Sequence, residues 1–202
     1  MNAQPRHMPR PHLTMPPEVA DLVTAACRRA DVILEYGSGG STVLAAGMPG
    51  KHVMSVESDR AWVRRMRRWF RENPPADGTS VEVIWSNIGE TSDWGHPADD
   101  SAWRRFPRYP LGVWQRDDFR HPDVVLVDGR FRIGCALATA FNITRPVTLL
   151  FDDYARHKGM RQQVETYLGQ PHMTGRMAEF RVTPTPIPAN HLLQIIKFMS
   201  RA

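Results

Sequence analysis

The chain has 202 residues and is 42% hydrophobic, enough for one substantial core and too little for two independent ones. Its 26 Lys and Arg against 21 Asp and Glu give a net charge of +5. No apolar run approaches the roughly 20 residues of a membrane helix, and residues 1–15 lack the apolar stretch of a signal peptide. We therefore expect one soluble, cytoplasmic domain over residues 1–202 with no membrane partner, and a flexible N-terminus at residues 1–15.

The first half of the chain alternates short β-branched runs with amphipathic stretches, the pattern of a parallel sheet covered by helices. Strands are expected at residues 32–36, 52–56 and 81–85. Helices are expected at residues 17–30 and 59–72. Asp59 is the predicted N-cap of the second helix, and Asn73-Pro74-Pro75 ends it. The arginines between Arg60 and Arg71 alternate with apolar residues, so we interpret them as a solvated helix face and not as a nucleic-acid surface.

The second half continues this pattern and then departs from it. Strands are expected at residues 123–127, 148–151, 180–183 and 192–198. Helices are expected at residues 129–142 and 161–168. The connection at residues 184–188 is too short and proline-rich for a crossover helix, so the last two strands should be antiparallel neighbours. The predicted fold class is α/β: a Rossmann-like, seven-stranded, mostly parallel sheet with helices on both faces and an antiparallel C-terminal strand pair.

A glycine-rich loop follows the first predicted strand. Glycines at this place allow a sharp turn and a close approach of a ligand to the backbone, although a plain turn also uses them. The loop resembles the first motif of class I S-adenosylmethionine-dependent methyltransferases, an acid followed by alternating glycines. Glu35, Gly37 and Gly39 match it, whereas the third glycine of the motif would fall at Ser41 and is displaced to Gly40. The resemblance implies cofactor contacts from Glu35, Gly37, Ser38, Gly39, Gly40 and Ser41.

Two further residues extend this resemblance. Glu57 ends the second strand about twenty residues after the loop, where a carboxylate can accept hydrogen bonds from both hydroxyls of an adenosine ribose. Its alternative role is that of an acid at a helix N-terminus. Asn87 follows the third strand, where the family often contacts adenine, and a turn-forming asparagine is the alternative. We expect both to bind the cofactor.

Carboxylates follow the fourth and fifth strands. Asp128 and the pair Asp152-Asp153 should meet at the edge of the sheet that carries the glycine loop. This pattern resembles the catechol type of small-molecule O-methyltransferase, which Asp128 and Asp152 match, whereas Asp153 replaces an asparagine. The resemblance implies a Mg²⁺ ion held by Asp128, Asp152 and Asp153. Helix capping without a metal is the alternative. Asp128 is the first candidate for a catalytic residue, and His157 and Lys158 are further candidates that could take a proton.

Residues 91–122 are too long for a bare connection and are rich in tryptophan. We interpret them as an insertion that covers the substrate as a lid, with packing of the tryptophans on the sheet as the alternative.

The predicted function is transfer of a methyl group from S-adenosyl-L-methionine to an oxygen of a small molecule, without a nucleic-acid partner. One alternative is an NAD(P)-dependent oxidoreductase, although the third glycine of a dinucleotide motif would fall at Thr42. The other is a module of the same fold that binds a cofactor or a nucleic acid without catalysis.

Overall fold

The computed structural model describes residues 8–156, 159 and 161–202. One seven-stranded sheet has the order β3-β2-β1-β4-β5-β7-β6. The first five strands pair in parallel, β7 is antiparallel to β5, and β6 is antiparallel to β7, which confirms the predicted fold class. The strands are β1 (Val32–Tyr36), β2 (His52–Glu57), β3 (Ser80–Trp85), β4 (Val124–Val127), β5 (Val147–Phe151), β6 (His172–Thr174) and β7 (Met177–Val182).

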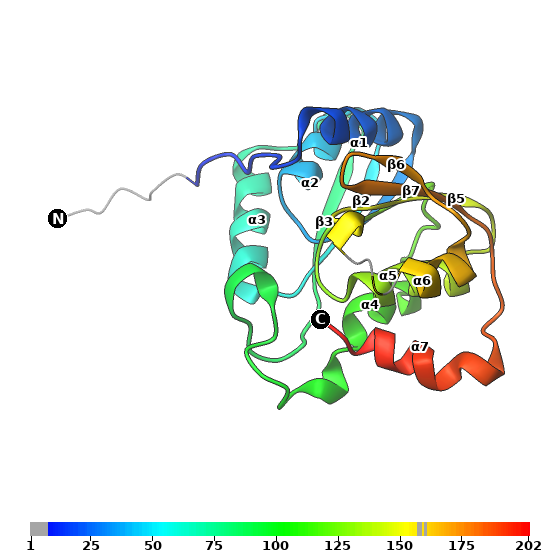
Figure 1. Ribbon diagram of the computed structural model, residues 1–202. Helices are drawn as coiled ribbons and strands as arrows, with labels where there is room; N and C mark the ends of the chain where they lie inside the picture. Colours follow the sequence, from blue (N-terminus) through cyan, green and yellow to red (C-terminus); the bar gives the residue numbers. More distant parts are fainter. Residues whose placement is uncertain (1–7, 157–158, 160) are drawn as a thin grey trace.

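Helices cover both faces of the sheet (Figure 1). The described α-helices are α1 (Pro17–Arg29), α2 (Gly40–Ala46), α3 (Arg60–Glu72), α4 (Arg108–Leu111), α5 (Arg132–Asn142), α6 (Arg161–Leu168) and α7 (Leu192–Met199). Alternate strand residues point to opposite faces. Ile33 and Leu126 pack in one cluster with Val19 of α1, while Leu34 and Val125 belong to a cluster that includes α5 and α7.

The sheet ends in an antiparallel strand pair as predicted, but one of the two strands predicted for that pair was wrong. Residues 192–198 form the helix α7 and no strand, and the strand that pairs with β7 is the unpredicted β6. In α7 the buried residues are Ile195, Phe198 and Met199, a spacing of three and four that buries one helix face against α5. A two-residue turn with Gly175 at φ +55° joins β6 to β7.

The N-cap prediction for α3 is confirmed, since the Asp59 carboxylate accepts hydrogen bonds from the N–H groups of Ala61 (2.7 Å) and Trp62 (3.0 Å). The buried face of α3 consists of Val63, Met66 and Trp69, and its arginines are exposed. Within the described part of the chain, none of the helices has the length and apolar character that crossing a bilayer requires.

The insertion at residues 91–122 contains α4 and the 3₁₀ turns η1 (Asp93–Gly95), η2 (Trp103–Arg105) and η3 (Gly112–Gln115). Part of it belongs to the core, where Phe106 and Tyr109 are buried against the sheet. The Trp114 indole donates a hydrogen bond to the Tyr36 hydroxyl (2.7 Å), so this tryptophan packs on the sheet as the alternative interpretation held. Trp94 is 87% exposed, and a lid role for the insertion stays a prediction.

Candidate active site

A cavity of about 480 Å³ lies at the carboxyl ends of β1, β2 and β4. Its wall contains the glycine loop from Gly37 to Ser41, together with Glu57 and Asp128. These residues are far apart in the sequence and were predicted to meet because parallel strands end at one edge of the sheet. The structure brings them together around a single cavity.

Close backbone packing requires two glycines at this edge. Gly37 has φ +100°, and a Cβ on it would lie 2.7 Å from Gly129 Cα. A Cβ on Gly129 would lie 2.1 Å from the Tyr109 hydroxyl. Gly37 and Gly129 therefore let the loops after β1 and β4 touch, and a larger residue at either position would separate them.

Gly39 has a different environment. A Cβ on Gly39 would meet nothing within 4 Å, and its extended backbone (φ 179°) suits any residue. Since Gly39 lines the cavity, its missing side chain leaves space for a ligand and relieves no protein contact.

Gly40, the displaced glycine of the motif, has a packing role of its own. A Cβ on Gly40 would lie 2.2 Å from the backbone of His12 and of Leu13, so this glycine allows the N-terminal segment to cross the start of α2. Residues 11–15, part of the predicted flexible N-terminus, form one side of the cavity wall. We did not foresee this segment, because its lack of periodicity gave no signal of a tertiary contact.

Glu35 lies beneath the glycine loop and outside the cavity wall. Its carboxylate accepts hydrogen bonds from the hydroxyls of Ser41, Thr42 (2.5 Å) and Ser55 (2.7 Å). Burial raises its pKa to about 7, and the three hydroxyl donors only partly oppose this effect. Glu35 therefore fixes the two hydroxyl residues that begin α2.

Glu57 joins the end of β2 to both neighbouring loops. Its Oε1 accepts from the N–H groups of Ser58 (2.6 Å) and Asp59 (2.9 Å), and its Oε2 accepts from the Ser38 N–H (3.2 Å). Burial raises the pKa of Glu57, while these backbone donors lower it. The Ser58 hydroxyl also donates to the Gly95 carbonyl (2.8 Å), which ties the insertion to the end of β2.

Arginines accompany the carboxylates that follow β4 and β5. Asp152 is fully buried, and both of its oxygens accept from Arg176, at 2.9 and 2.7 Å. Arg132 forms ion pairs with Asp128 (3.2 Å) and Asp153 (3.4 Å). Burial raises the pKa of Asp128, as does the neighbouring Asp152, and Arg132 opposes them.

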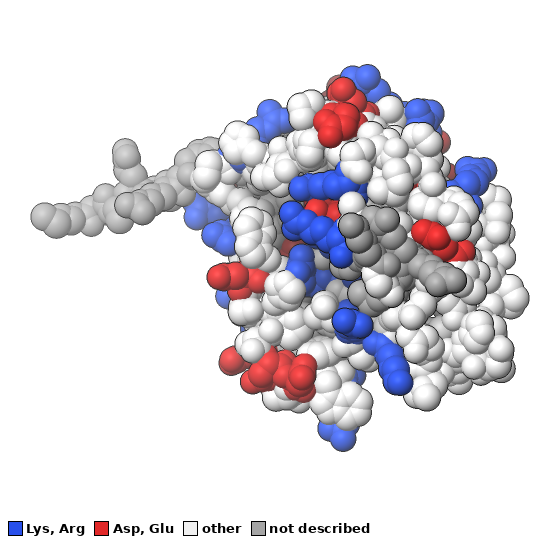
Figure 2. Space-filling view, viewed as in Figure 1, with Lys and Arg blue, Asp and Glu red and all other residues white. Residues whose placement is uncertain are grey.

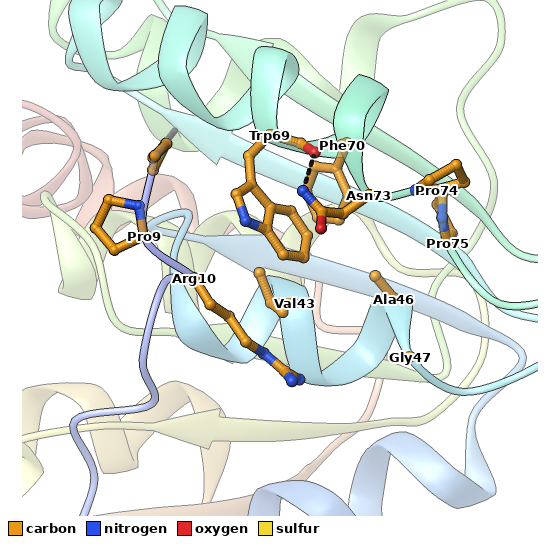
Figure 3. A pocket seen from close by; sticks show the side chains of 11 residues that line it. Pro9, Arg10, Val43, Ala46, Gly47, Trp69, Phe70, Asn73, Pro74 and Pro75 are labelled. Atoms are coloured by element: carbon orange, nitrogen blue, oxygen red, sulfur yellow. Dashed lines mark hydrogen bonds between the residues drawn. The ribbon is translucent and has the colours of Figure 1, made fainter. Parts of the chain in front are cut away.

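A second cavity, of about 380 Å³, lies near the C-terminal ends of α2 and α3 (Figure 3). Apolar side chains such as Val43 and Trp69 line it, and Asn73 donates a hydrogen bond to the Trp69 carbonyl there (3.0 Å). It lies away from the carboxyl ends of the strands and from the carboxylates described above. We therefore assign the candidate active site to the cavity at the glycine loop.

Comparison with known proteins identifies the family. No family model matches the chain, and no curated protein matches it significantly. The crystal structure of a methyltransferase-like protein from Silicibacter pomeroyi is 62% identical, covers 96% of this chain and 99% of its own, and superimposes with a TM-score of 0.93. The chain belongs to the S-adenosylmethionine-dependent methyltransferase family.

Solved methyltransferase structures of much lower identity share the fold. An O-methyltransferase from Streptomyces achromogenes, solved in complex with S-adenosylmethionine, is 17% identical with a TM-score of 0.52, and the match covers 85% of this chain and 82% of that one. A methyltransferase from Geobacter sulfurreducens is 14% identical with a TM-score of 0.51 over 83% and 81% of the two chains. The predicted resemblance is confirmed, and the oxidoreductase alternative is not favoured.

The structure places Asn87 in a turn, and two other candidate residues fall outside the described part of the chain. Asn87 is outside the cavity wall, and its Oδ1 accepts from the Gly89 N–H (3.1 Å), the turn that we gave as the alternative. Its contact with adenine stays a prediction. The candidate proton acceptors His157 and Lys158 lie outside the described residues.

The expected Mg²⁺ site of the methyltransferase does not fit the residues present. Arg176 and Arg132 supply the positive charge that Asp128, Asp152 and Asp153 need, and no group of three metal-ligating side chains occurs in the described part of the chain. Arg132 follows Asp128 by four residues, a signal that we could have used. Arg176 could not be found, because it lies in the turn before β7 and β6 was not predicted.

Proposed function

We propose that this chain is a methyltransferase that transfers the methyl group of S-adenosylmethionine to an oxygen of a small molecule. The observation that carries the proposal is the single cavity whose wall joins the glycine loop, Glu57 and Asp128. The 62% identical methyltransferase-like protein supports the transfer of a methyl group. The distantly similar O-methyltransferase has the same fold. The choice of an oxygen as the methyl acceptor rests on the presence of Asp128 as a base.

The residues at the cavity fit the cofactor. Gly39 leaves open space at the wall, which suits close approach of the methionine part. Glu57 Oε2 accepts a single hydrogen bond from the described residues, so it keeps capacity for a ribose hydroxyl. When bound, S-adenosylmethionine supplies an electrophilic methyl group.

Asp128 is the residue that we assign to proton transfer. A hydroxyl acceptor becomes a better nucleophile when a neighbouring base takes its proton, and the base is most effective when its pKa lies near the working pH. Burial and the charge of Asp152 raise the pKa of Asp128, and Arg132 holds one of its oxygens in place. The proton of the acceptor hydroxyl would move to the Asp128 carboxylate.

Calorimetry with S-adenosylhomocysteine tests the cofactor assignment. We expect the wild-type protein to bind it and not to bind NADH. Gly39→Val should reduce the affinity by at least tenfold, because the new side chain fills the open space of the cavity without backbone strain. Gly112→Val is the matched control, since a Cβ on Gly112 also meets nothing within 4 Å and Gly112 is outside the cavity wall.

Binding of NADH in place of S-adenosylhomocysteine by the wild type would overturn the proposal. Equal affinities for Gly39→Val and the wild type would show that the cofactor lies elsewhere. Thermal melting of each variant separates a loss of binding from a loss of fold.

A further inference from the structure

A third cavity adjoins the candidate active site. It has a volume of about 290 Å³ and shares Gly129 and Arg130 with the wall of the cofactor cavity. Its other sides come from His96 of the insertion, from the first turn of α5 and from the C-terminal residues. A molecule bound there would lie next to the cofactor, where a methyl acceptor has to be.

The wall of this cavity is strongly basic. Its side chains include four arginines and one acidic residue, Asp153. The arginines are Arg130, Arg132, Arg156 and Arg201. On the face seen in Figure 2, Lys and Arg side chains gather in the middle, over the region where Figure 1 places the yellow turn η4 (Tyr154–Arg156) and the C-terminus. Such an arrangement attracts anions.

Arg130 differs from the arginines that hold the acidic groups. Arg132 and Arg156 both pair with Asp153, whereas none of the described carboxylates forms an ion pair with Arg130. The Nε atom of Arg130 is buried and has no hydrogen-bond acceptor among the described residues. Burial and the charge of Arg132 lower the pKa of Arg130, and the charges of Asp128 and Glu57, which form no ion pair with it, only partly oppose this effect. A half-buried guanidinium in this state gains from a bound anion, which would supply both an acceptor and the missing negative charge.

His96 holds the Arg130 guanidinium without neutralising it. The Nη1 group of Arg130 donates to His96 Nε2. Burial and the charges of Arg130 and Arg132 lower the pKa of His96, which keeps the ring neutral at pH 7. A neutral ring that accepts at Nε2 carries its proton on Nδ1. His96 is therefore a positioning residue for Arg130.

The start of α5 adds to this positive environment. Phe131, the N-cap residue, lies in the left-handed region (φ +50°) and gives no side-chain cap, and the first turn contains no acidic residue. Phe131, Arg132 and Ile133 all line the cavity. The uncapped N–H groups at a helix N-terminus favour an anion, and here they accompany the arginines.

We propose that this cavity binds an anionic group of the methyl acceptor, a carboxylate or a phosphate, with Arg130 as its main binding residue and His96 holding Arg130 in place. The identity of the ligand as a methyl acceptor rests on the proposed function. The binding of an anion does not.

Titrations with inorganic phosphate and with acetate test the anion site and distinguish the two chemistries. Each anion is added at constant ionic strength against chloride, with and without S-adenosylhomocysteine, and thermal stability is followed. We expect saturable stabilisation of the wild type by one of the two. Arg130→Gln should raise the apparent Kd of that anion at least tenfold, and Arg130→Lys should restore part of the affinity.

Two further variants keep the experiment decisive. Arg68→Gln is the control, because Arg68 is an exposed residue of α3 that pairs with Glu72 (2.7 Å) and does not line the cavity, and it should bind the anion as the wild type does. Arg201→Gln changes an exposed residue of the cavity wall and should weaken binding several-fold even if Arg130→Gln does not fold.

The outcomes separate the two proposals. The anion site would be overturned if neither anion gave saturable stabilisation. It would also be overturned if the wild type, Arg130→Gln and Arg201→Gln bound the anion with equal affinity. Anion binding that depends on these arginines in a protein that does not bind S-adenosylhomocysteine would support the anion site and reject the proposed function.

Discussion

Glu35 is a buried acid whose hydrogen bonds do not fully offset the loss of solvation. It is fully buried, and both of its oxygens accept hydrogen bonds from hydroxyls, of Ser41, Thr42 and Ser55. The burial of the charge outweighs these donors, so its pKa rises from 4.5 to about 7. This carboxyl group lies beneath the glycine loop, where its hydrogen bonds order Ser41 and Thr42 of α2.

The pH dependence of stability tests this environment of Glu35. Between about pH 4.5 and 7 the folded protein binds one more proton at Glu35 than the unfolded chain does. The contribution of Glu35 to the free energy of unfolding should therefore be fully present below pH 4.5 and fall by about 3 kcal/mol as the pH rises to 7. Glu35→Gln removes this pH-dependent contribution, because glutamine does not titrate.

Urea denaturation of the wild type and of Glu35→Gln between pH 4.5 and 8 measures the effect. The difference in stability, wild type minus variant, should decrease with rising pH and level off above pH 7. A difference that is independent of pH would mean that Glu35 titrates in the folded protein as it does in the unfolded chain.

At the scale of elements, the N-terminal segment belongs to the cofactor cavity although it has no regular structure of its own. It crosses the start of α2 at Gly40, and residues 11–15 form part of the cavity wall. Its position depends on the missing side chain of Gly40, because a single Cβ would overlap the backbone at residues 12 and 13.

Gly40→Ala should displace the segment. We expect at least a fivefold loss of affinity for S-adenosylhomocysteine, and faster hydrogen exchange in a peptide that covers residues 8–15. Gly47→Ala at the other end of α2 is the control, because its Cβ would make ordinary contacts at 3.5 and 3.6 Å. Unchanged exchange in Gly40→Ala would show that the segment does not depend on this contact.

At the scale of the whole molecule, the antiparallel pair β6–β7 supplies a partner for a carboxylate that follows one of the parallel strands. The turn between β6 and β7 carries Arg176, which reaches the buried Asp152 at the end of β5. The charge of Asp152 is thus balanced by a residue of the antiparallel pair β6–β7, which adjoins β5.

Arg176→Met should lower the free energy of unfolding by about 3 to 5 kcal/mol, because it leaves Asp152 buried without a partner. The double variant Arg176→Met with Asp152→Asn should recover part of this loss. Urea denaturation at pH 7 measures both values. A loss below about 1 kcal/mol would mean that Asp152 does not depend on the arginine.

Thermal denaturation of the wild type and of Asp152→Asn tests whether the protein binds Mg²⁺. Since arginines neutralise the carboxylates, we expect the melting temperature of the wild type to be the same with Mg²⁺ and with a chelator. A rise with Mg²⁺ that Asp152→Asn abolishes would instead restore the metal site that the sequence suggested.

The sequence by itself determined the five parallel strands, the glycine loop, and the meeting of Glu57 and Asp128 at one edge of the sheet. These features follow from local patterns, namely β-branched runs, turn residues and the rule that parallel strands end at the same edge. The same patterns placed Asp59 correctly as the cap of α3.

The tertiary structure alone decided which charges neutralise one another and what covers the loop. Arg176 is 24 residues from Asp152, and His12 is 28 residues from Gly40, and no periodicity connects residues so far apart. In α7, by contrast, the apolar residues recur at the helical spacing of three and four, so the strand predicted at residues 192–198 missed a local signal. Contacts between distant parts of a chain depend on the packed fold, because burial and charge pairing act through space and not along the sequence.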